Sequence, residues 1–215
     1  MADYRAPAGS IIPKLFIGMG GTGSRVVDRI AARAVKLPNW DAQLKNLVNF
    51  VTLDTNDLDQ DNLSDRIPPR NRINIAAFDK RKAVDGFRRS QNHQAEHWIP
   101  GDYQPREGVR PGAGQIRIES RLGFFFASPK IKEQLKEIIQ DTMSPRWAND
   151  RKQGKYSVYI ICSLAGGTGS GSFLSMAYLV QEVCRELDQE PRIIGNMMLS
   201  TLLTGVVENQ LHANI

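Results

Sequence analysis

The stretch YSVYIICSLAGGTGSG, residues 156–171, joins a run of apolar residues to a run of glycines. Residues 156–163 are rich in β-branched and aromatic side chains, which predicts a buried β-strand. From about Ser172 to Leu187, apolar residues recur at the three- and four-residue spacing of one helix face, which predicts a long helix. Glycines between a strand and a helix let the backbone approach a ligand closely, and the amino end of the helix favours an anion such as phosphate.

The pentapeptide GGTGS of this stretch, residues 166–170, also occurs at residues 20–24. The first copy likewise follows an apolar segment, 11–19, and precedes a helical pattern that is expected to begin near Ser24. Further strands are predicted at 47–53, 72–78 and 192–200. Strands that alternate with helices imply a doubly wound α/β fold, a parallel sheet with helices on both faces. Both glycine loops would then lie at the same edge of the sheet, where such folds bind ligands.

The regions between these elements carry weaker patterns. Residues 1–10 are expected to form a flexible arm. Residues 79–111 have clustered charges and no apolar period, so we expect an insertion with one helix and a mobile segment that contributes little to the core. A helical stretch is predicted at 121–126, followed by a separate amphipathic helix at 129–142 with Pro129 in its first turn. The chain from 1 to 215 is interpreted as one domain.

The composition excludes several classes of protein. The 215 residues are 41% hydrophobic and 24% charged, the balance of an ordinary globular chain. The longest apolar run, residues 156–165, is about half as long as a membrane helix requires, and the first residues do not have the form of a signal peptide. The two cysteines, Cys162 and Cys184, lie in apolar segments, which indicates buried reduced thiols and a soluble cytoplasmic protein.

The charge pattern argues against nucleic acid as a partner. The net charge is +5, and the excess of Lys and Arg falls mainly between Arg66 and Lys155. Aromatic residues are not interleaved there in the way that would stack bases. A solvated basic face is therefore favoured, with a nucleic-acid site as the alternative.

The two glycine loops predict two phosphate cradles. The pattern G-x-G-x-x-G at residues 18–23 is by itself a weak dinucleotide fingerprint, which a packing turn also satisfies. The loop at 166–171 is more specific, and a side chain at Gly167 or Gly169 is expected to intrude on bound phosphates. Neither loop carries the Lys-Ser/Thr pair of a P-loop. Two cradles at one edge indicate a polyphosphate nucleotide, and the hydroxyls expected to help bind it are those of Thr22, Ser24, Thr168 and Ser170.

The segment AGGTGSG, residues 165–171, resembles the signature of the tubulin/FtsZ family, G-G-T-G-[ST]-G between a strand and a helix. The segment FIGMGGTGSRVVDRI, residues 16–30, is similar to the first glycine loop of FtsZ and of the bacterial tubulin-like proteins. Residues 53–56 (LDTN) resemble the loop after the second strand, and residues 112–115 (GAGQ) resemble the FtsZ loop that faces the γ-phosphate. The four motifs keep the family's order over nearly the whole chain, so it resembles the nucleotide-binding domain of a bacterial tubulin/FtsZ-like GTPase.

The resemblance implies a bound GTP or GDP with Mg²⁺, and head-to-tail filaments with assembly-linked GTP hydrolysis in the full-length protein. It places Asp54 and Asn56 near the γ-phosphate or Mg²⁺, although a polar turn that ends a strand also explains these residues. Asn214 lies where the family contacts the base, with helix capping or plain exposure as the alternatives. The nucleotide-binding residues implied are Gly20, Gly21, Thr22, Gly23, Ser24, Asp54, Asn56, Gly114, Gln115, Ala165, Gly166, Gly167, Thr168, Gly169, Ser170, Gly171 and Asn214.

The sequence also departs from the family pattern. Tyr178 and Gln181 stand where FtsZ carries its ribose-binding Glu and a phosphate-binding Arg. Arg121 could approach phosphate or form a surface ion pair. The family's central helix, catalytic acid loop and second domain would follow residue 215, so no catalytic residue is assigned and the 215-residue chain is expected to bind GTP without hydrolysing it.

Two other functions remain open from the residues alone. An NAD-binding Rossmann domain would use Gly18, Gly20 and Gly23 for the pyrophosphate and Asp54 for a ribose, but it leaves the second glycine loop unexplained. A non-catalytic tubulin-like domain would serve instead as an interaction platform through its insertion.

Overall fold

The computed structural model describes residues 11–76, 79–89, 98–105, 116–149, 152 and 154–199. Its strands are β1 (Lys14–Met19), β2 (Val48–Asp54), β3 (Arg72–Asn74), β4 (Lys155–Ser163) and β5 (Glu190–Met198). Its α-helices are α1 (Gly20–Ala34), α2 (Asp57–Asp61), α3 (Lys80–Arg89), α5 (Arg117–Met143) and α6 (Gly167–Glu186). The predicted arm at 1–10 and the predicted site residues Gly114, Gln115 and Asn214 lie outside the described residues.

All five strands are parallel, in the order β3-β2-β1-β4-β5. The first half of the chain builds outward from β1 to β3, and the second half continues on the other side of β1 with β4 and β5. The strand order therefore reverses between β1 and β4. Such a reversal opens a crevice at the carboxyl ends of the strands, which is where doubly wound sheets bind ligands. The predicted fold class is confirmed.

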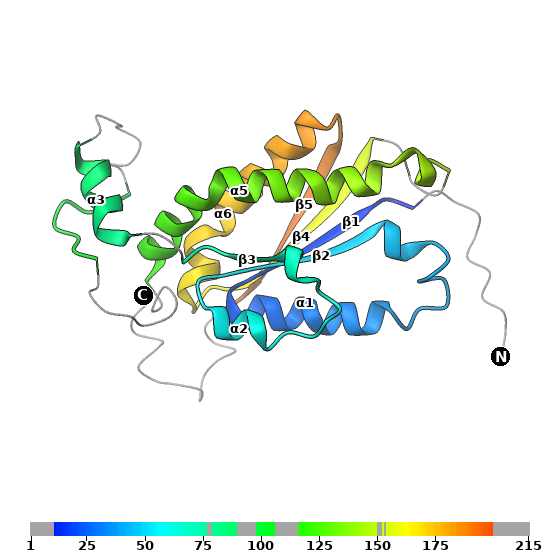
Figure 1. The fold of residues 1–215 in the computed structure, drawn as a ribbon, viewed down its shortest axis with the longest axis horizontal. Helices are drawn as coiled ribbons and strands as arrows, with labels where there is room; N and C mark the ends of the chain where they lie inside the picture. The colour runs from blue at the N-terminus through cyan, green and yellow to red at the C-terminus, as the bar shows by residue number, and fades with distance from the viewer. Residues whose placement is uncertain are drawn as a thin grey trace.

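Helices cover both faces of the sheet, with α1 on one side and α5 and α6 on the other (Figure 1). On the α1 side, Val27 and Ala31 pack with Phe50 and Ile161. The larger core lies under α5 and α6 and includes the side chains that the amphipathic pattern placed inward on α5: Ile131, Leu135, Ile138 and Ile139. Strands with both faces covered are apolar throughout, which explains the continuous apolar runs in the sequence.

Both helices that follow the glycine segments begin earlier than predicted. The helix α1 begins at Gly20 instead of Ser24, and α6 begins at Gly167 instead of Ser172. Glycine disfavours helix by about 1 kcal/mol relative to alanine, which is why the sequence suggested loops. Close packing outweighs that cost, because a Cβ at Gly23 would lie 2.2 Å from the Ile161 carbonyl oxygen.

The prediction of two helices between residues 121 and 142 is wrong, because α5 continues through Pro129. A proline inside a helix cannot donate its backbone hydrogen bond to the carbonyl four residues earlier, here that of Phe125. The Ser128 hydroxyl donates to this carbonyl instead, at 2.7 Å. A neighbouring side chain therefore replaces the hydrogen bond that proline removes.

Residues 79–89 and 98–105, which we call the docked segment, pack against the first turns of α5. Val84 and Ile99 of this segment form a small core with Leu122 of α5. Figure 1 shows α3 beyond the amino end of α5, away from the sheet. The described part of residues 79–111 contributes this separate small core and no residue to the main core under α5 and α6, in line with the expectation that the segment contributes little to the main core.

Cys162 and Cys184 are buried and free, as the sequence predicted. Burial raises the pKa of each thiol to about 11, so both remain protonated at neutral pH. None of the helices within the described ranges combines the length and the apolarity needed to cross a membrane.

The approach of α1 to β4 gives a first testable prediction. A methyl group at Gly23 would overlap the Ile161 carbonyl, so Gly23→Ala should destabilise the fold by about 1–3 kcal/mol, the usual cost of overpacking. Gly86→Ala is the matched control, because a Cβ there meets no atom within 4 Å and should be neutral or slightly stabilising. Urea unfolding of both variants measures the difference; equal midpoints would contradict the close approach.

Candidate functional site

The carboxyl ends of β1 and β4 bring the two glycine segments together. The two strands pair in parallel, with Met19 opposite Cys162, so the segments that follow them leave the sheet at the same edge. A Cβ at Gly20 would lie 3.4 Å from both the Gly169 nitrogen and the Thr168 Cβ. Gly20 also has φ +72°, a left-handed conformation that side chains other than glycine rarely adopt. The predicted juxtaposition of the two segments is therefore present.

Three helix amino ends converge at this edge. The first turns of α1 and α6 meet at Gly20 and Gly169, and α5 joins them because the Arg117 carbonyl oxygen lies 2.3 Å from a Cβ placed on Gly171. The N-cap residues Met19, Ile116 and Gly166 do not cap these helices with their side chains. The first N–H groups of a helix lack intrahelical partners and carry the positive end of the dipole. The arrangement suits an anion with several charged groups.

Thr168 holds the three surrounding elements together. Its hydroxyl donates to Asp54 Oδ1 at 3.2 Å and lies 2.8 Å from the Thr55 hydroxyl, which ties α6 to the end of β2. Its carbonyl oxygen accepts from the Ser120 hydroxyl of α5 at 2.8 Å and from the Ser172 hydroxyl at 2.6 Å. Thr168 was predicted as a direct phosphate ligand; in the structure its hydroxyl is bonded to side chains of the loop after β2.

Asp54 is a buried carboxylate at the end of β2, with 2% of its surface exposed. Its Oδ1 accepts from the backbone N–H groups of Thr55 at 2.7 Å and Asn56 at 3.3 Å, while its Oδ2 has no hydrogen-bond partner. Burial raises the pKa of Asp54 to about 6, and the nearby charge of Asp59 also raises it, against the lowering effect of these hydrogen bonds. An orphaned oxygen of this kind is a suitable ligand for a cation or a water.

Asn56 was predicted beside Asp54, but its side chain serves the next helix. Asn56 Oδ1 accepts from the Leu58 N–H at 3.2 Å and caps α2, while its Nδ2 donates to Asp59 Oδ2 at 3.0 Å. Asp59 also pairs with Arg25 at 3.1 Å and lies 3.0 Å from a Cβ placed on Gly21. Asp59 therefore borders the amino end of α1, a position that the sequence did not indicate.

The predicted hydroxyls do not all reach the open edge. Ser24 is buried and its hydroxyl donates to the Gly18 carbonyl at 3.5 Å, while Ser170 donates to the backbone carbonyls of Gly166 and Gly167. Thr22 is exposed. Of these three, only Thr22 has a hydroxyl that is not bonded to the backbone, within the part of the chain that the structure describes.

The glycines of the signature divide into two groups. Gly169 faces the sheet, because its Cβ would meet the Cys162 Cβ at 2.6 Å and the Met19 oxygen at 3.0 Å. The expectation that a side chain at Gly169 would intrude on phosphate is therefore replaced by a packing role, and Gly171 packs similarly against Arg117. Gly166 faces open space, with no atom within 4 Å of an added Cβ. It lies at the amino end of α6, where an anion would approach.

Two arginines of α5 lie near this edge. The guanidinium of Arg121 stacks on the Trp98 ring, 4.5 Å from its centroid, instead of forming the expected ion pair. Arg117 was missed in the sequence, although it is the first residue of α5. Its guanidinium donates to the Leu164 carbonyl at 3.3 Å, which brings a positive charge to the residues just before the signature.

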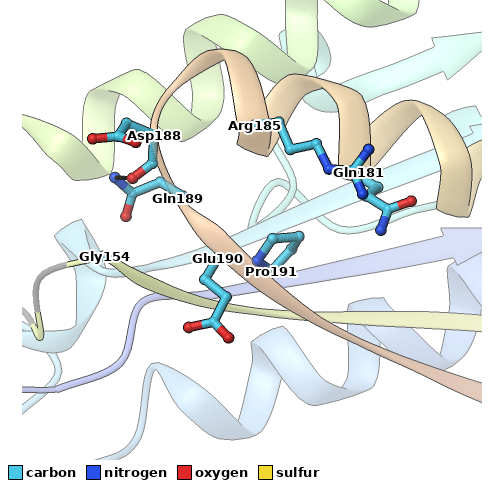
Figure 2. Close-up of a pocket in the computed structure, with 7 residues that line it drawn as sticks. All are labelled: Gly154, Gln181, Arg185, Asp188, Gln189, Glu190 and Pro191. Atoms are coloured by element: carbon cyan, nitrogen blue, oxygen red, sulfur yellow. Dashed lines mark hydrogen bonds between the residues drawn. The ribbon is translucent and has the colours of Figure 1, made fainter.

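A pocket of about 480 Å³ lies at the opposite edge of the sheet (Figure 2). It is formed by the last turns of α6 and the turn into β5, where Gln181 and Arg185 face Glu190 and Pro191. All of α6 except its last turns separates this pocket from the glycine segments. Gln181, the residue at the position of the family's arginine, therefore faces away from the glycine-lined edge.

Metal ligands at the glycine-lined edge are few. No cluster of three or more His, Cys, Asp or Glu side chains that could hold a metal occurs among the residues that the structure describes. Mg²⁺ commonly binds through one or two carboxylates and the phosphates of its substrate, so a single buried carboxylate such as Asp54 fits that mode.

The reversal of strand order, the two glycine segments and the converging helix ends define a doubly wound domain with three helix amino ends at its switch point. The chain belongs to the tubulin-like family, whose model matches residues 15–214. No match is found among curated proteins.

Solved structures resemble the chain at low sequence identity. CetZ from Methanosaeta thermophila superposes with a TM-score of 0.50 at 16% identity, covering 87% of this chain and 37% of that one. A GTPγS-form protofilament of TubZ from Bacillus thuringiensis serovar israelensis gives a TM-score of 0.48 at 14% identity, over 88% of this chain and 38% of that one. The likeness to CetZ supports the fold. The chain spans less than half the length of either relative.

Proposed function

We propose that this chain is the GTP- or GDP-binding domain of a tubulin/FtsZ-like protein. The observation that carries the proposal is the meeting of three helix amino ends, none capped by its N-cap side chain, at Gly20, Gly169 and Gly171. The N–H groups of the first turns of α1 and α6 would bind the phosphates, with Gly21, Thr22 and Gly167 in those turns. The guanine base is inferred from membership of the family, and the phosphates from the geometry.

Asp54 is the residue that we propose for the cation. Its Oδ2 is buried without a partner, and Thr168 and two backbone N–H groups hold its Oδ1 in place. Mg²⁺ bound there would neutralise the charge of the β- and γ-phosphates. Gly114, Gln115 and Asn214 remain proposals from the resemblance, for the γ-phosphate and the base respectively.

In the full-length protein we propose head-to-tail self-association with hydrolysis linked to assembly. A contact that repeats without closing on itself generates a filament. The partner's acidic loop would complete the site, so that hydrolysis follows association. Positioning and charge stabilisation dominate phosphoryl transfer, so a site divided between two subunits is inactive until they meet.

Titration with labelled nucleotides tests the binding proposal. We expect GTP and GDP to bind the 215-residue chain in the presence of Mg²⁺, and NAD to compete weakly or not at all. An NAD-binding domain would use the first glycine segment for the pyrophosphate. It would have no role for the second glycine segment at the amino end of α6. Tight NAD binding without GTP binding would favour the Rossmann alternative, and binding of none of the nucleotides would favour the interaction platform.

A phosphate-release assay tests the catalytic part of the proposal. We expect negligible GTP turnover by the 215-residue chain, because Asp54 and Glu119 are the buried carboxylates within its described residues and neither is assigned to activate water. Glu119 is paired with Lys80, and Asp54 is assigned to the cation. A GTPase rate per molecule that does not depend on protein concentration, and that Asp54→Ala abolishes, would contradict this expectation and indicate a complete site within one chain.

A further inference from the structure

The docked segment contacts α5 at Glu119 and Arg121, the two residues on either side of Ser120, which binds the glycine signature. Glu119 accepts from Lys80 Nζ at 2.5 Å and from the Tyr103 hydroxyl at 3.3 Å. Two positions further on, Arg121 stacks on Trp98 of the same segment. Both ends of the docked segment are therefore held by the first turns of α5.

Ser120 lies between these two contact residues and serves the other side of the helix. It is completely buried, and its hydroxyl donates to the Thr168 carbonyl at 2.8 Å and contacts the Ser172 hydroxyl at 3.2 Å. Consecutive residues of α5 thus bind the docked segment on one side and the glycine signature on the other. A shift of this helical turn would therefore move the contacts with the docked segment and the contact with Thr168 together.

The contact between the docked segment and α5 includes one buried ion pair among the described residues, Lys80–Glu119. Glu119 is 2% exposed, and the side chain of Lys80 is 24% exposed. A buried carboxylate that loses its cationic partner is costly even with the Tyr103 hydroxyl still in place, so loss of Lys80 would force the first turn of α5 to adjust. Such an adjustment would reach Thr168 through Ser120.

We propose that Glu119 is a positioning residue for the nucleotide site. The Lys80–Glu119 pair holds the first turns of α5 against Thr168, so docking of residues 79–89 and 98–105 and binding of nucleotide strengthen each other. Thermodynamic linkage makes this effect reciprocal: bound nucleotide also stabilises the docked segment. The inference rests on the proposed function, because it assigns a regulator to the same phosphate site.

The test combines nucleotide affinity with hydrogen exchange on the 215-residue chain. Lys80→Met and Glu119→Gln should each weaken GTP binding about fivefold or more, within the usual range of coupling between sites. The double variant should bind more tightly than Lys80→Met alone, because it also removes the buried charge that Lys80 no longer neutralises. In the wild type, GTP should slow amide exchange in residues 79–89, and in the single variants this protection should be lost.

Lys82→Met is the matched control, since Lys82 is exposed on the same helix and pairs only locally with Asp79 at 3.6 Å. It should change neither affinity nor exchange. Tyr103→Phe removes only the hydroxyl that donates to Glu119, and it provides a milder variant should the others fail to fold. It should also weaken GTP binding.

A wild-type chain that binds no GTP would overturn the proposed function and this inference with it. A wild type that binds GTP, with single variants of unchanged affinity or with GTP-independent exchange at 79–89, would overturn the positioning role alone.

Discussion

Gly166→Val should leave the fold intact and lower nucleotide affinity by about 100-fold or more, which corresponds to a loss of about 2.8 kcal/mol of binding free energy. Gly166 has φ −86° and ψ 162°, a conformation that valine adopts readily, and an added Cβ meets no atom within 4 Å. The valine side chain would instead occupy the space in front of the amino end of α6, where the phosphates are expected. The loss of glycine at the N-cap should cost less than about 1 kcal/mol of stability.

Fluorescence titration with labelled GTP and a urea unfolding curve measure the two effects of this substitution. Gly86→Val is the control for a valine placed in open space elsewhere, and it should alter neither quantity. Gly171→Val is the contrasting variant: its side chain would overlap the Arg117 carbonyl, so it should lower stability as well as binding. Full GTP affinity in a folded Gly166→Val protein would remove the amino end of α6 from the site.

Asp54→Asn should raise stability at neutral pH and weaken Mg²⁺-dependent GTP binding. The folded-state pKa of Asp54, about 6, lies above the ordinary value of 3.8, so the folded protein holds this proton more tightly than the unfolded chain. The resulting stabilisation is complete below pH 3.8 and is lost as the pH rises through about 6. A shift of about two pH units corresponds to about 3 kcal/mol.

At neutral pH the wild type must bury an ionised carboxylate at position 54. Asparagine avoids the cost of burying that charge, because it is neutral and its oxygen can accept the same hydrogen bonds as Asp54 Oδ1. We therefore expect the variant to be more stable than the wild type by about 2 kcal/mol at pH 8, with the difference shrinking toward zero near pH 4. Unfolding curves across this range measure it, and Asp61→Asn, at the exposed end of α2, is the control. A variant destabilised equally at every pH would show that the carboxylate has a structural role.

Much of the fold was predictable because its signals are local. Most strand boundaries were predicted to within three residues, because buried parallel strands are continuous apolar runs. The weakest, β3, is shorter than predicted. The starts of α1 and α6 were misplaced because glycine is used there for contact with the sheet, which helix propensity does not reveal. The continuous α5 depends on Ser128 next to Pro129, a compensation that the general rule for proline does not include.

The site was predictable only in part, for the same reason. The glycine segments and Asp54 occur in recognisable motifs at the ends of strands. Ser120, Arg117 and Asp59 have no such local signal, because their contacts join positions far apart in the sequence. The docking of residues 79–89 and 98–105 on α5 also depends on contacts of this kind.

The bond between Thr168 and Asp54 joins residues 114 positions apart, and β1 pairs with β4 over a still longer separation, with Lys14 opposite Ser157. During synthesis, the cradle cannot form until the ribosome has released α6. Until β4 has also been released, β1 lacks its neighbour on one side, and the unpaired edge of a strand with apolar residues such as Leu15 and Ile17 is a hazard for aggregation. Long-range pairing of this kind is slow to form. A ligand that binds only the completed sheet would draw the newly made chain toward the native state, so the nucleotide concentration in the cell would help to set the yield of folded protein.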